Sequence, residues 1–315
     1  MPLLGRLFSS VPVIHPGQSQ VVSPHTGLSA FLPPSQTDRS ERHPESIVYR
    51  TIDGYQLTMD LFVPSQSAQS LRPAVVLLHG GGWVFGISGP QDMAFSARRF
   101  AEAGYVAATV GYRRTGEPKH PWQWPDPLHD VQDAVRWLRT HADRYAIDPM
   151  RIVAYGHSAG AHLATMLAVR DDDPAGTGIS SRVNGAISLA GHMDLRIPYV
   201  DRFARDSLRA LLGEKPNRVP DRAANASPLA WVDRYTAPML LLYGHADSQV
   251  PPAHHRRMAD ALRNAGVAVT VVERPDADHF SIAEWSCAGS WALAFIAAVT
   301  ATPTCSSHSP GGTRP

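Results

Sequence analysis

The sequence predicts an α/β protein with a mostly parallel central sheet and helices on both faces. Short, wholly apolar runs alternate with longer segments whose apolar residues recur at helical spacing. Strands buried on both faces read as continuous apolar runs, because neither face meets water. A length of 315 residues with 43% hydrophobic and 18% charged residues is enough for one large domain of this kind.

The chain divides into three parts. Residues 1–44 are rich in Pro, Ser, Gln and His and show no periodicity, which predicts a flexible or loosely docked extension. Residues 45–300 form the predicted domain, and residues 301–315 read as a disordered tail. The domain opens with two expected strands around a turn at Asp53 and Gly54, because β-branched and aromatic residues flank this tight-turn dipeptide.

The predicted elements follow in order. Buried strands are expected at 74–78, 105–110, 151–155, 185–189, 239–243 and 267–272. Helices are expected at 130–142, 159–169, 253–265 and 282–299, where apolar residues recur at helical spacing. Residues 194–230 interrupt this alternation with mixed charge and several prolines, and we expect them to form a small helical insertion that covers a site.

Composition excludes several functions. The 29 basic residues against 28 acidic ones give a net charge of +1, which provides no basic field for nucleic acid. Cys287 and Cys305 lack the paired spacing of metal sites, so we expect free thiols, with a disulfide between them left open. Arg6 interrupts the apolar start, and no apolar run reaches ~18 residues, so neither a secretory signal nor a membrane span is predicted. We expect a cytoplasmic protein.

The sharpest motif is Gly156-His157-Ser158-Ala159-Gly160, which matches G-x-S-x-G between an expected strand and an expected helix. A serine at such a turn adopts a strained backbone, and the flanking glycines remove side chains that would collide there. The following helix directs its amides toward the reacting centre. The alternative is a chance match in a small-residue turn, but the strand and helix on either side favour a nucleophilic Ser158.

A second motif, His79-Gly80-Gly81-Gly82-Trp83, directly follows an apolar strand. Consecutive glycines let backbone amides face a ligand, as an oxyanion hole requires. The expected donors are the amides of Gly81 and Gly82 with that of Ala159. The alternative is a flexible linker, and His79 itself is expected to fix the loop by hydrogen bonding.

A nucleophilic serine needs a histidine base and an acid, in the chain order serine, acid, histidine. Asp247 follows the strand expected at 239–243, and His279 follows the last expected strand. Ligand sites in open α/β sheets lie at these strand ends. Asp276 and Asp278 compete for the role of acid, but they are close to His279 in sequence and are expected to shape its loop.

These motifs, with Gly111-Tyr112-Arg113 and the run from Asp133 to Ile152, resemble the α/β-hydrolase superfamily over about residues 46–300. Within it the chain is similar to hormone-sensitive-lipase-like carboxylesterases, feruloyl-esterase-like enzymes and kynurenine formamidases. His157 stands where the lipase-like branch usually has an acid, and Trp83 stands where that branch has Phe or Tyr. These departures favour the feruloyl-esterase-like and formamidase side.

The resemblance implies an α/β-hydrolase fold and an enzyme that cleaves carboxylic esters through an acyl-enzyme, without a metal or organic cofactor. The expected partner is a small ester, with a homodimer left open. Alternatives are an arylformamidase, a serine exopeptidase and, least favoured, a non-catalytic binding protein. The residues expected around the substrate are Trp83, His157, Trp122, Trp124 and Phe280.

Overall fold

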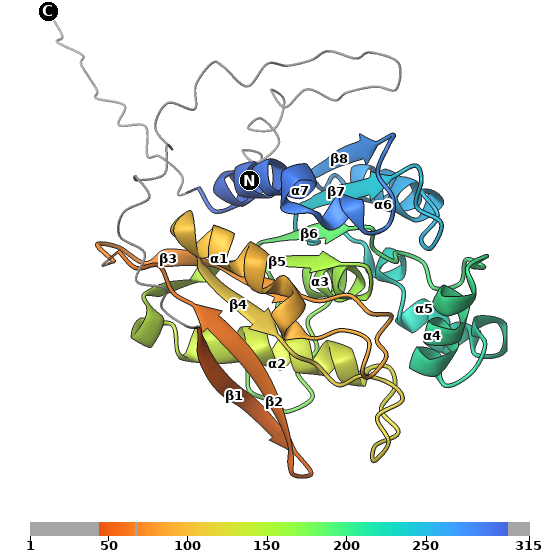
Figure 1. The fold of residues 1–315 in the computed structure, drawn as a ribbon, viewed down its shortest axis with the longest axis horizontal. Coiled ribbons are helices and arrows are strands. Elements are labelled where there is room, and N and C mark those ends of the chain that lie inside the picture. Colours follow the sequence, from red (N-terminus) through yellow and green to blue (C-terminus); the bar gives the residue numbers. More distant parts are fainter. Residues whose placement is uncertain (1–43, 67, 302–315) are drawn as a thin grey trace, which may run out of the picture.

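A computed structural model describes residues 44–66 and 68–301, and in them eight strands form one sheet in the order β1-β2-β4-β3-β5-β6-β7-β8 (Figure 1). β1 pairs antiparallel with β2 and β2 with β4, whereas all later neighbours are parallel. The strands are β1 (Glu45–Ile52), β2 (Tyr55–Phe62), β3 (Arg72–Leu78), β4 (Val106–Val110), β5 (Ile147–His157), β6 (Gly185–Leu189), β7 (Met239–Gly244) and β8 (Val269–Arg274).

Helices cover both faces of this sheet. The α-helices of the described residues are α1 (Ala94–Glu102), α2 (Asp126–Thr140), α3 (Ala159–Val169), α4 (Arg202–Leu212), α5 (Pro220–Asn225), α6 (Ala253–Asn264) and α7 (Trp285–Val299). Alternate residues of β3 face opposite layers: Val76 and Leu78 pack in the layer that contains α2 and α3, whereas Val75 and Leu77 pack in the layer that contains α1 and α7. The sheet is therefore buried on both sides, as its apolar runs predict.

The predicted α/β-hydrolase architecture is confirmed, including the opening hairpin around Asp53 and Gly54. The strand at 185–189 and the helix at 159–169 have the predicted bounds, and the other expected elements differ at their ends by one to four residues. α1 was not predicted. The predictions for the extension, the tail and Cys305 concern residues that lie outside the described ones, except for residues 44 and 301.

The segment expected as a helical insertion contains α4 and α5, which lie beyond the ends of β5 and β6 (Figure 1). α4 has well-defined ends. The carboxylate of Asp201 accepts a hydrogen bond from the Ala204 amide at 2.8 Å, and Gly213 ends the helix in the left-handed region at φ 78°. Its buried face includes Ser207, Leu208 and Leu211, and this face lies toward the domain.

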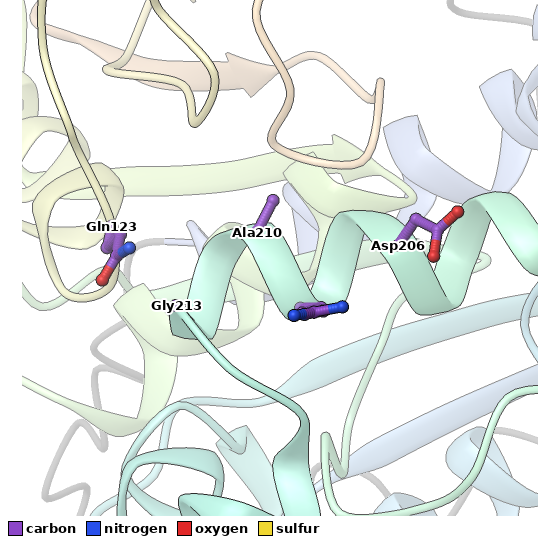
Figure 2. A pocket seen from close by; sticks show the side chains of 5 residues that line it. Gln123, Asp206, Ala210 and Gly213 are labelled. Carbon is purple, nitrogen blue, oxygen red and sulfur yellow. The ribbon is translucent and has the colours of Figure 1, made fainter.

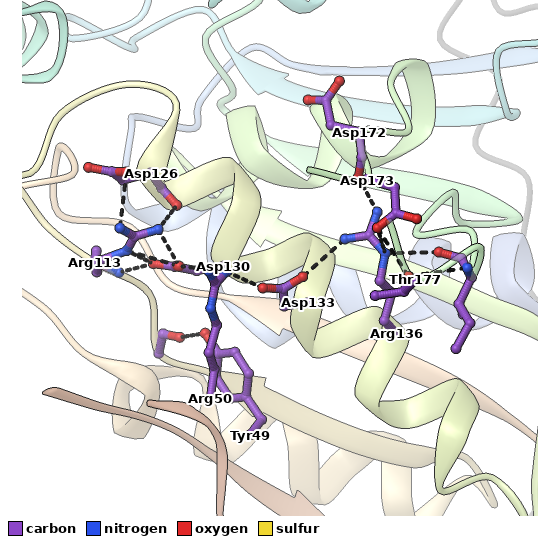
Figure 3. Close-up of polar contacts among 12 residues, drawn as sticks. Tyr49, Arg50, Arg113, Asp126, Asp130, Asp133, Arg136, Asp172, Asp173 and Thr177 are labelled. Carbon is purple, nitrogen blue, oxygen red and sulfur yellow. Dashed lines mark hydrogen bonds and ion pairs between the residues drawn. The ribbon is translucent and has the colours of Figure 1, made fainter. Parts of the chain in front are cut away.

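A polar network fixes the loop after β4 to the start of α2 (Figure 3). The buried Arg113 guanidinium contacts the carboxylates of Asp130 and Asp126 at 2.8 and 3.0 Å. Burial raises the pKa of Asp130, and the hydrogen bonds from Arg113 oppose that rise. A buried carboxylate is stable only when it is paired in this way. The Gly-Tyr-Arg motif therefore has a structural role in this chain.

In the described ranges, no helix combines the length and the apolar character needed to cross a membrane.

Candidate active site

Ser158 occupies a strained turn between β5 and α3. Its φ of 54° and ψ of −118° lie in a region that L-residues rarely adopt. A Cβ at Gly156 would stand 2.3 Å from the Gly160 carbonyl oxygen, and one at Gly160 would stand 2.0 Å from the Leu78 carbonyl oxygen. Both glycines are therefore required for the turn. The turn places the serine at the carboxyl end of β5, and the surrounding structure maintains its strained backbone.

The structure brings together the three residues predicted to carry the chemistry. The Nε2 atom of His279 lies 2.9 Å from the Ser158 hydroxyl oxygen, and Nδ1 lies 2.9 Å from a carboxylate oxygen of Asp247. All three side chains are buried, with exposed fractions of 7% or less. The Asp247 carboxylate accepts a hydrogen bond from Nδ1–H and so leaves Nε2 as the acceptor that faces Ser158. This arrangement can remove a proton from the serine.

Asp247 is fixed by its own backbone. Its Oδ1 atom accepts hydrogen bonds from the amides of Gln249 and Val250, each at 2.8 Å, and Oδ2 is left for His279. Asp278 instead accepts from the Phe280 and Ser281 amides and shapes the loop that carries His279. The expectation that Asp247 rather than Asp278 faces the histidine agrees with this geometry.

The glycine loop after β3 presents free amides. Gly81 and Gly82 have φ values of 98° and 61°, which only glycine adopts readily. Within the part of the chain that the structure describes, the amides of Gly81, Gly82 and Ala159 donate no hydrogen bond. The buried His79 fixes the loop as expected: it donates from Nδ1 to the Gly80 carbonyl at 2.8 Å and stacks on Tyr112. The site thus has unpaired donors for a developing negative charge.

His157 contacts the loop that carries His279. Its Nε2 atom lies 2.7 Å from the carbonyl oxygen of His279, so the ring nitrogen donates to the backbone of the neighbouring histidine. Burial lowers the pKa of His157 to about 4 and keeps the ring neutral. This hydrogen bond indicates a role in holding the His279 loop, and the expected substrate contact stays a prediction.

The three tryptophans expected around the substrate are buried. Trp83 is 1% exposed and packs on the rings of His162 and His192. Trp124 donates from its indole nitrogen to Asn225 at 2.8 Å and so ties the insertion down, whereas Trp122 packs on Tyr55 of β2. These contacts give each ring a packing role, and contact of the three rings with substrate stays a prediction. Proximity to a motif in sequence does not fix the direction in which a ring points.

Exposed apolar side chains instead surround the glycine loop and the histidine. Phe280 is 66% exposed, with its ring 5.3 Å from that of His279. Phe203 of α4 approaches Gly82, and Ile87 approaches Gly81; these side chains are 41% and 57% exposed. Of the three, only Phe280 was expected from sequence. Phe203 is distant in sequence from the motifs, whereas Ile87 lies four residues after Trp83.

A group of buried histidines near this site was also missed. His162, His192, His254 and His255 are all buried, and desolvation lowers the pKa of each ring. The position of His192 in the sequence could have indicated a place near the site. His192 follows the end of β6, as Asp247 follows the end of β7. His245, by contrast, lies near the surface beside Glu273.

A hollow on α4 contains none of the predicted site residues. Figure 2 shows side chains that line it, which come from α4, from Gly213 at its end and from Gln123. The residues that line it are Gln123, Asp206, Arg209, Ala210 and Gly213. Across the described ranges, no group of three or more His, Cys, Asp or Glu side chains is arranged to hold a metal ion.

The strained serine turn, the hydrogen-bonded histidine and the glycine loop on this sheet define an α/β-hydrolase. More specifically, the chain belongs to the BD-FAE family, whose model matches residues 59–262.

Two named relatives illustrate this similarity. Esterase LipQ of Mycobacterium tuberculosis is 31% identical over 221 residues, which cover 66% of this chain and 50% of that protein. Ethyl acetate hydrolase of Pseudomonas putida is 31% identical over 241 residues, or 73% of this chain and 72% of that protein. The chain thus spans about half the length of some curated relatives that it matches.

Solved structures agree with these relatives. Esterase Est2 of Thermogutta terrifontis with bound propionate has a TM-score of 0.67 at 29% identity, over 81% of this chain and 92% of that one. The same enzyme phosphonylated by sarin has a TM-score of 0.69 at 30% identity, over the same shares. A truncated carbohydrate esterase from gut microbiota, with a TM-score of 0.70 at 20% identity, supports the fold alone.

Proposed function

We propose that this protein is a serine carboxylesterase, with Ser158 as nucleophile, His279 as general base and Asp247 as the acid that orients it. The observation that carries the proposal is the chain of two 2.9 Å contacts through His279, beside the unpaired amides of the glycine loop. The esterases among the relatives support the same activity.

The first half of the reaction follows from this geometry. Nε2 of His279 takes the Ser158 proton while the serine oxygen attacks the ester carbonyl carbon. The carbonyl oxygen becomes negatively charged and accepts hydrogen bonds from the amides of Gly81, Gly82 and Ala159. When the carbon–oxygen bond to the alcohol breaks, His279 returns its proton to the departing oxygen, and the acyl group stays on Ser158.

The second half repeats these steps with water. His279 removes a proton from a water molecule, which attacks the acyl carbon and releases the carboxylic acid as the serine oxygen regains its proton. Removal of one oxyanion donor typically raises the barrier of such a step by ~3–4 kcal/mol. The reaction balances without a metal or an organic cofactor, and we expect chelators to leave it unchanged.

The substrate class follows from the surroundings of the site. Phe280, Phe203 and Ile87 expose apolar surface beside the base and the glycine loop, which favours esters with apolar substituents. Propionate and ethyl acetate in the names of related esterases support small acyl groups. We therefore propose small, largely apolar esters as substrates.

The alternatives have less support. The relatives described above are ester hydrolases by name, which favours an ester over a formamide or a peptide bond. A binding protein would have no need for a nucleophile, base, acid and free amides in one place. The absence of nucleic acid binding, a homodimer and a cytoplasmic location stay predictions.

One panel of substrates tests the proposal. Purified protein is assayed with p-nitrophenyl esters of increasing acyl length, a feruloyl ester and N-formylkynurenine. We expect the highest kcat/KM with a short-chain ester. A kcat/KM for N-formylkynurenine above that of every ester would contradict the proposal and favour the formamidase alternative.

A further inference from the structure

A buried histidine at the end of β6 stands between the strands that carry the nucleophile and the acid. His192 lies in the loop after β6, and β6 pairs with β5 on one side and β7 on the other. The Ser158 amide donates to the Leu189 carbonyl at 2.9 Å, which joins the two loops directly. His192 packs on Trp83 of the glycine loop, with ring centres 4.9 Å apart. Its ring therefore packs against the loop that carries two of the proposed oxyanion donors.

The backbone on each side of His192 is held by another histidine. The Gly191 amide donates to Nε2 of His255 at 3.0 Å, and the Met193 amide donates to Nδ1 of His254 at 3.2 Å. Both acceptor rings are fully buried on α6. Two adjacent residues of one helix thus fix both neighbours of His192, which is the kind of support that a precisely placed binding group requires.

The hydrogen bond to Tyr199 determines which nitrogen of His192 carries the proton. Nδ1 of His192 lies 2.7 Å from the Tyr199 hydroxyl, and that hydroxyl has no other partner among the described residues. A buried hydroxyl must donate to avoid an unpaired proton, so Nδ1 accepts and Nε2 carries the hydrogen. Desolvation keeps the pKa of His192 well below its usual value, so the ring stays neutral.

The Nε2–H group of His192 has no hydrogen-bond partner among the described residues. It is less enclosed than the unpaired ring nitrogens of the neighbouring buried histidines. Nδ1 of His162 and Nε2 of His254 are also unpaired in the described chain, but both atoms are fully enclosed. Nε2 of His192 has no partner among the described residues and is not fully enclosed, although the residue is only 4% exposed. A buried donor without a partner is costly unless something supplies an acceptor.

We propose that His192 donates a hydrogen bond from Nε2 to an oxygen atom in the acyl part of the substrate, so that the enzyme prefers acyl groups that carry an ether, hydroxyl or carbonyl oxygen near the scissile bond. The inference rests on the proposed esterase function. The acyl side is assigned because the departing alcohol takes its proton from His279, beside the exposed Phe280, whereas His192 contacts the glycine loop.

A pair of nearly isosteric esters tests this assignment. p-Nitrophenyl methoxyacetate and p-nitrophenyl butyrate differ by one oxygen in place of a methylene group. The ratio of their kcat/KM values is measured for the wild type, His192→Leu and Tyr199→Phe. Each kcat/KM value is divided by the rate constant for hydrolysis of the same ester by hydroxide, which corrects for the different intrinsic reactivity of the two esters. We expect the corrected ratio to fall at least tenfold in His192→Leu and to fall partly in Tyr199→Phe, which loses the bond that sets the proton on Nε2.

Two further comparisons complete the test. The pair 2-methoxyethyl acetate and butyl acetate places the same oxygen on the alcohol side, and we expect its ratio to stay constant in His192→Leu. His192→Gln retains a donor and should recover part of the acyl ratio. If His192→Leu lowers only the alcohol ratio, or leaves the acyl ratio unchanged, the inference is wrong. If the wild type hydrolyses none of these esters faster than Ser158→Ala does, the proposed function itself is wrong.

Discussion

The ring of His157 donates a hydrogen bond to the backbone of His279, with 2.7 Å between Nε2 and the carbonyl oxygen. The residue before the nucleophile thus holds the loop that carries the base. Since the pKa of His157 lies at about 4, the ring is neutral near pH 7 and Nε2 keeps the hydrogen that this bond needs.

Replacement of His157 by Leu should therefore affect both stability and activity. The buried carbonyl of His279 would lose its partner, which typically costs ~1–3 kcal/mol of unfolding free energy. We expect a lower midpoint in urea and a reduced kcat, because the base is less firmly placed. His245→Leu is the matched control, since His245 lies near the surface beside Glu273, and it should change neither quantity. Equal effects of the two variants would show that the His157 bond has no special role.

Asp247→Asn and Asp278→Asn test which aspartate orients His279. Asp247 contacts Nδ1 of His279, whereas Asp278 accepts from the amides of its own loop. In a serine triad, the change of the acid to Asn lowers kcat by about 10⁴, because the histidine takes the wrong tautomer. We expect a loss of this order for Asp247→Asn and less than tenfold for Asp278→Asn. The reverse order, measured with one ester at pH 7, would assign the acid to Asp278.

Stability should fall as the pH is lowered from 6.5 to 4. Burial lowers the pKa of His79, His157, His162 and His254 from 6.5 to about 4. The unfolded chain then binds protons in this range while the folded protein does not, so each of these histidines lowers the unfolding free energy by up to about 1.4 kcal/mol per pH unit as the pH falls. Urea unfolding at pH 7, 6 and 5 measures the slope. A constant unfolding free energy would show that these rings are not held neutral.

Gly82 and Gly86 offer a matched pair in one loop. Both have positive φ values, 61° and 77°, so Ala strains either position by roughly 1–2 kcal/mol. A Cβ at Gly82 would stand 2.6 Å from the Ser207 hydroxyl oxygen of α4, whereas one at Gly86 would meet nothing within 4 Å. We expect Gly82→Ala to lower kcat at least tenfold, because the loop amides must shift, and Gly86→Ala to retain kcat. Similar rates for both variants would argue against a precisely placed Gly82 amide.

Local pattern predicts much of this structure. The continuous apolar runs indicate strands that are buried on both faces of the sheet. The helix after Ser158 has its predicted bounds of residues 159–169. α1 was missed because its nine residues include Arg98, Arg99 and an exposed Phe95, which weaken the apolar stripe. In the candidate site, the order of Ser158, Asp247 and His279 along the strands was enough to bring them together.

Tertiary contacts account for what the sequence could not predict. The direction of the Trp122 ring depends on its packing against Tyr55, 67 residues away. The role of His157 depends on the loop of His279, and that of His192 depends on amides held by α6. A histidine gives the same signal in sequence whether it accepts from an amide, supports a loop or faces a substrate.

The central claim is that Ser158 is the nucleophile, and covalent labelling tests it most directly. Wild-type protein and Ser158→Ala are treated with a serine-directed organophosphate, and the modified residue is identified by peptide mass spectrometry. The account predicts one adduct, on Ser158, with loss of esterase activity in step with labelling. Ser158→Ala should fold with an unchanged unfolding midpoint, take no label and have no activity above the background rate. An adduct on another serine, or full activity of Ser158→Ala, would contradict the account.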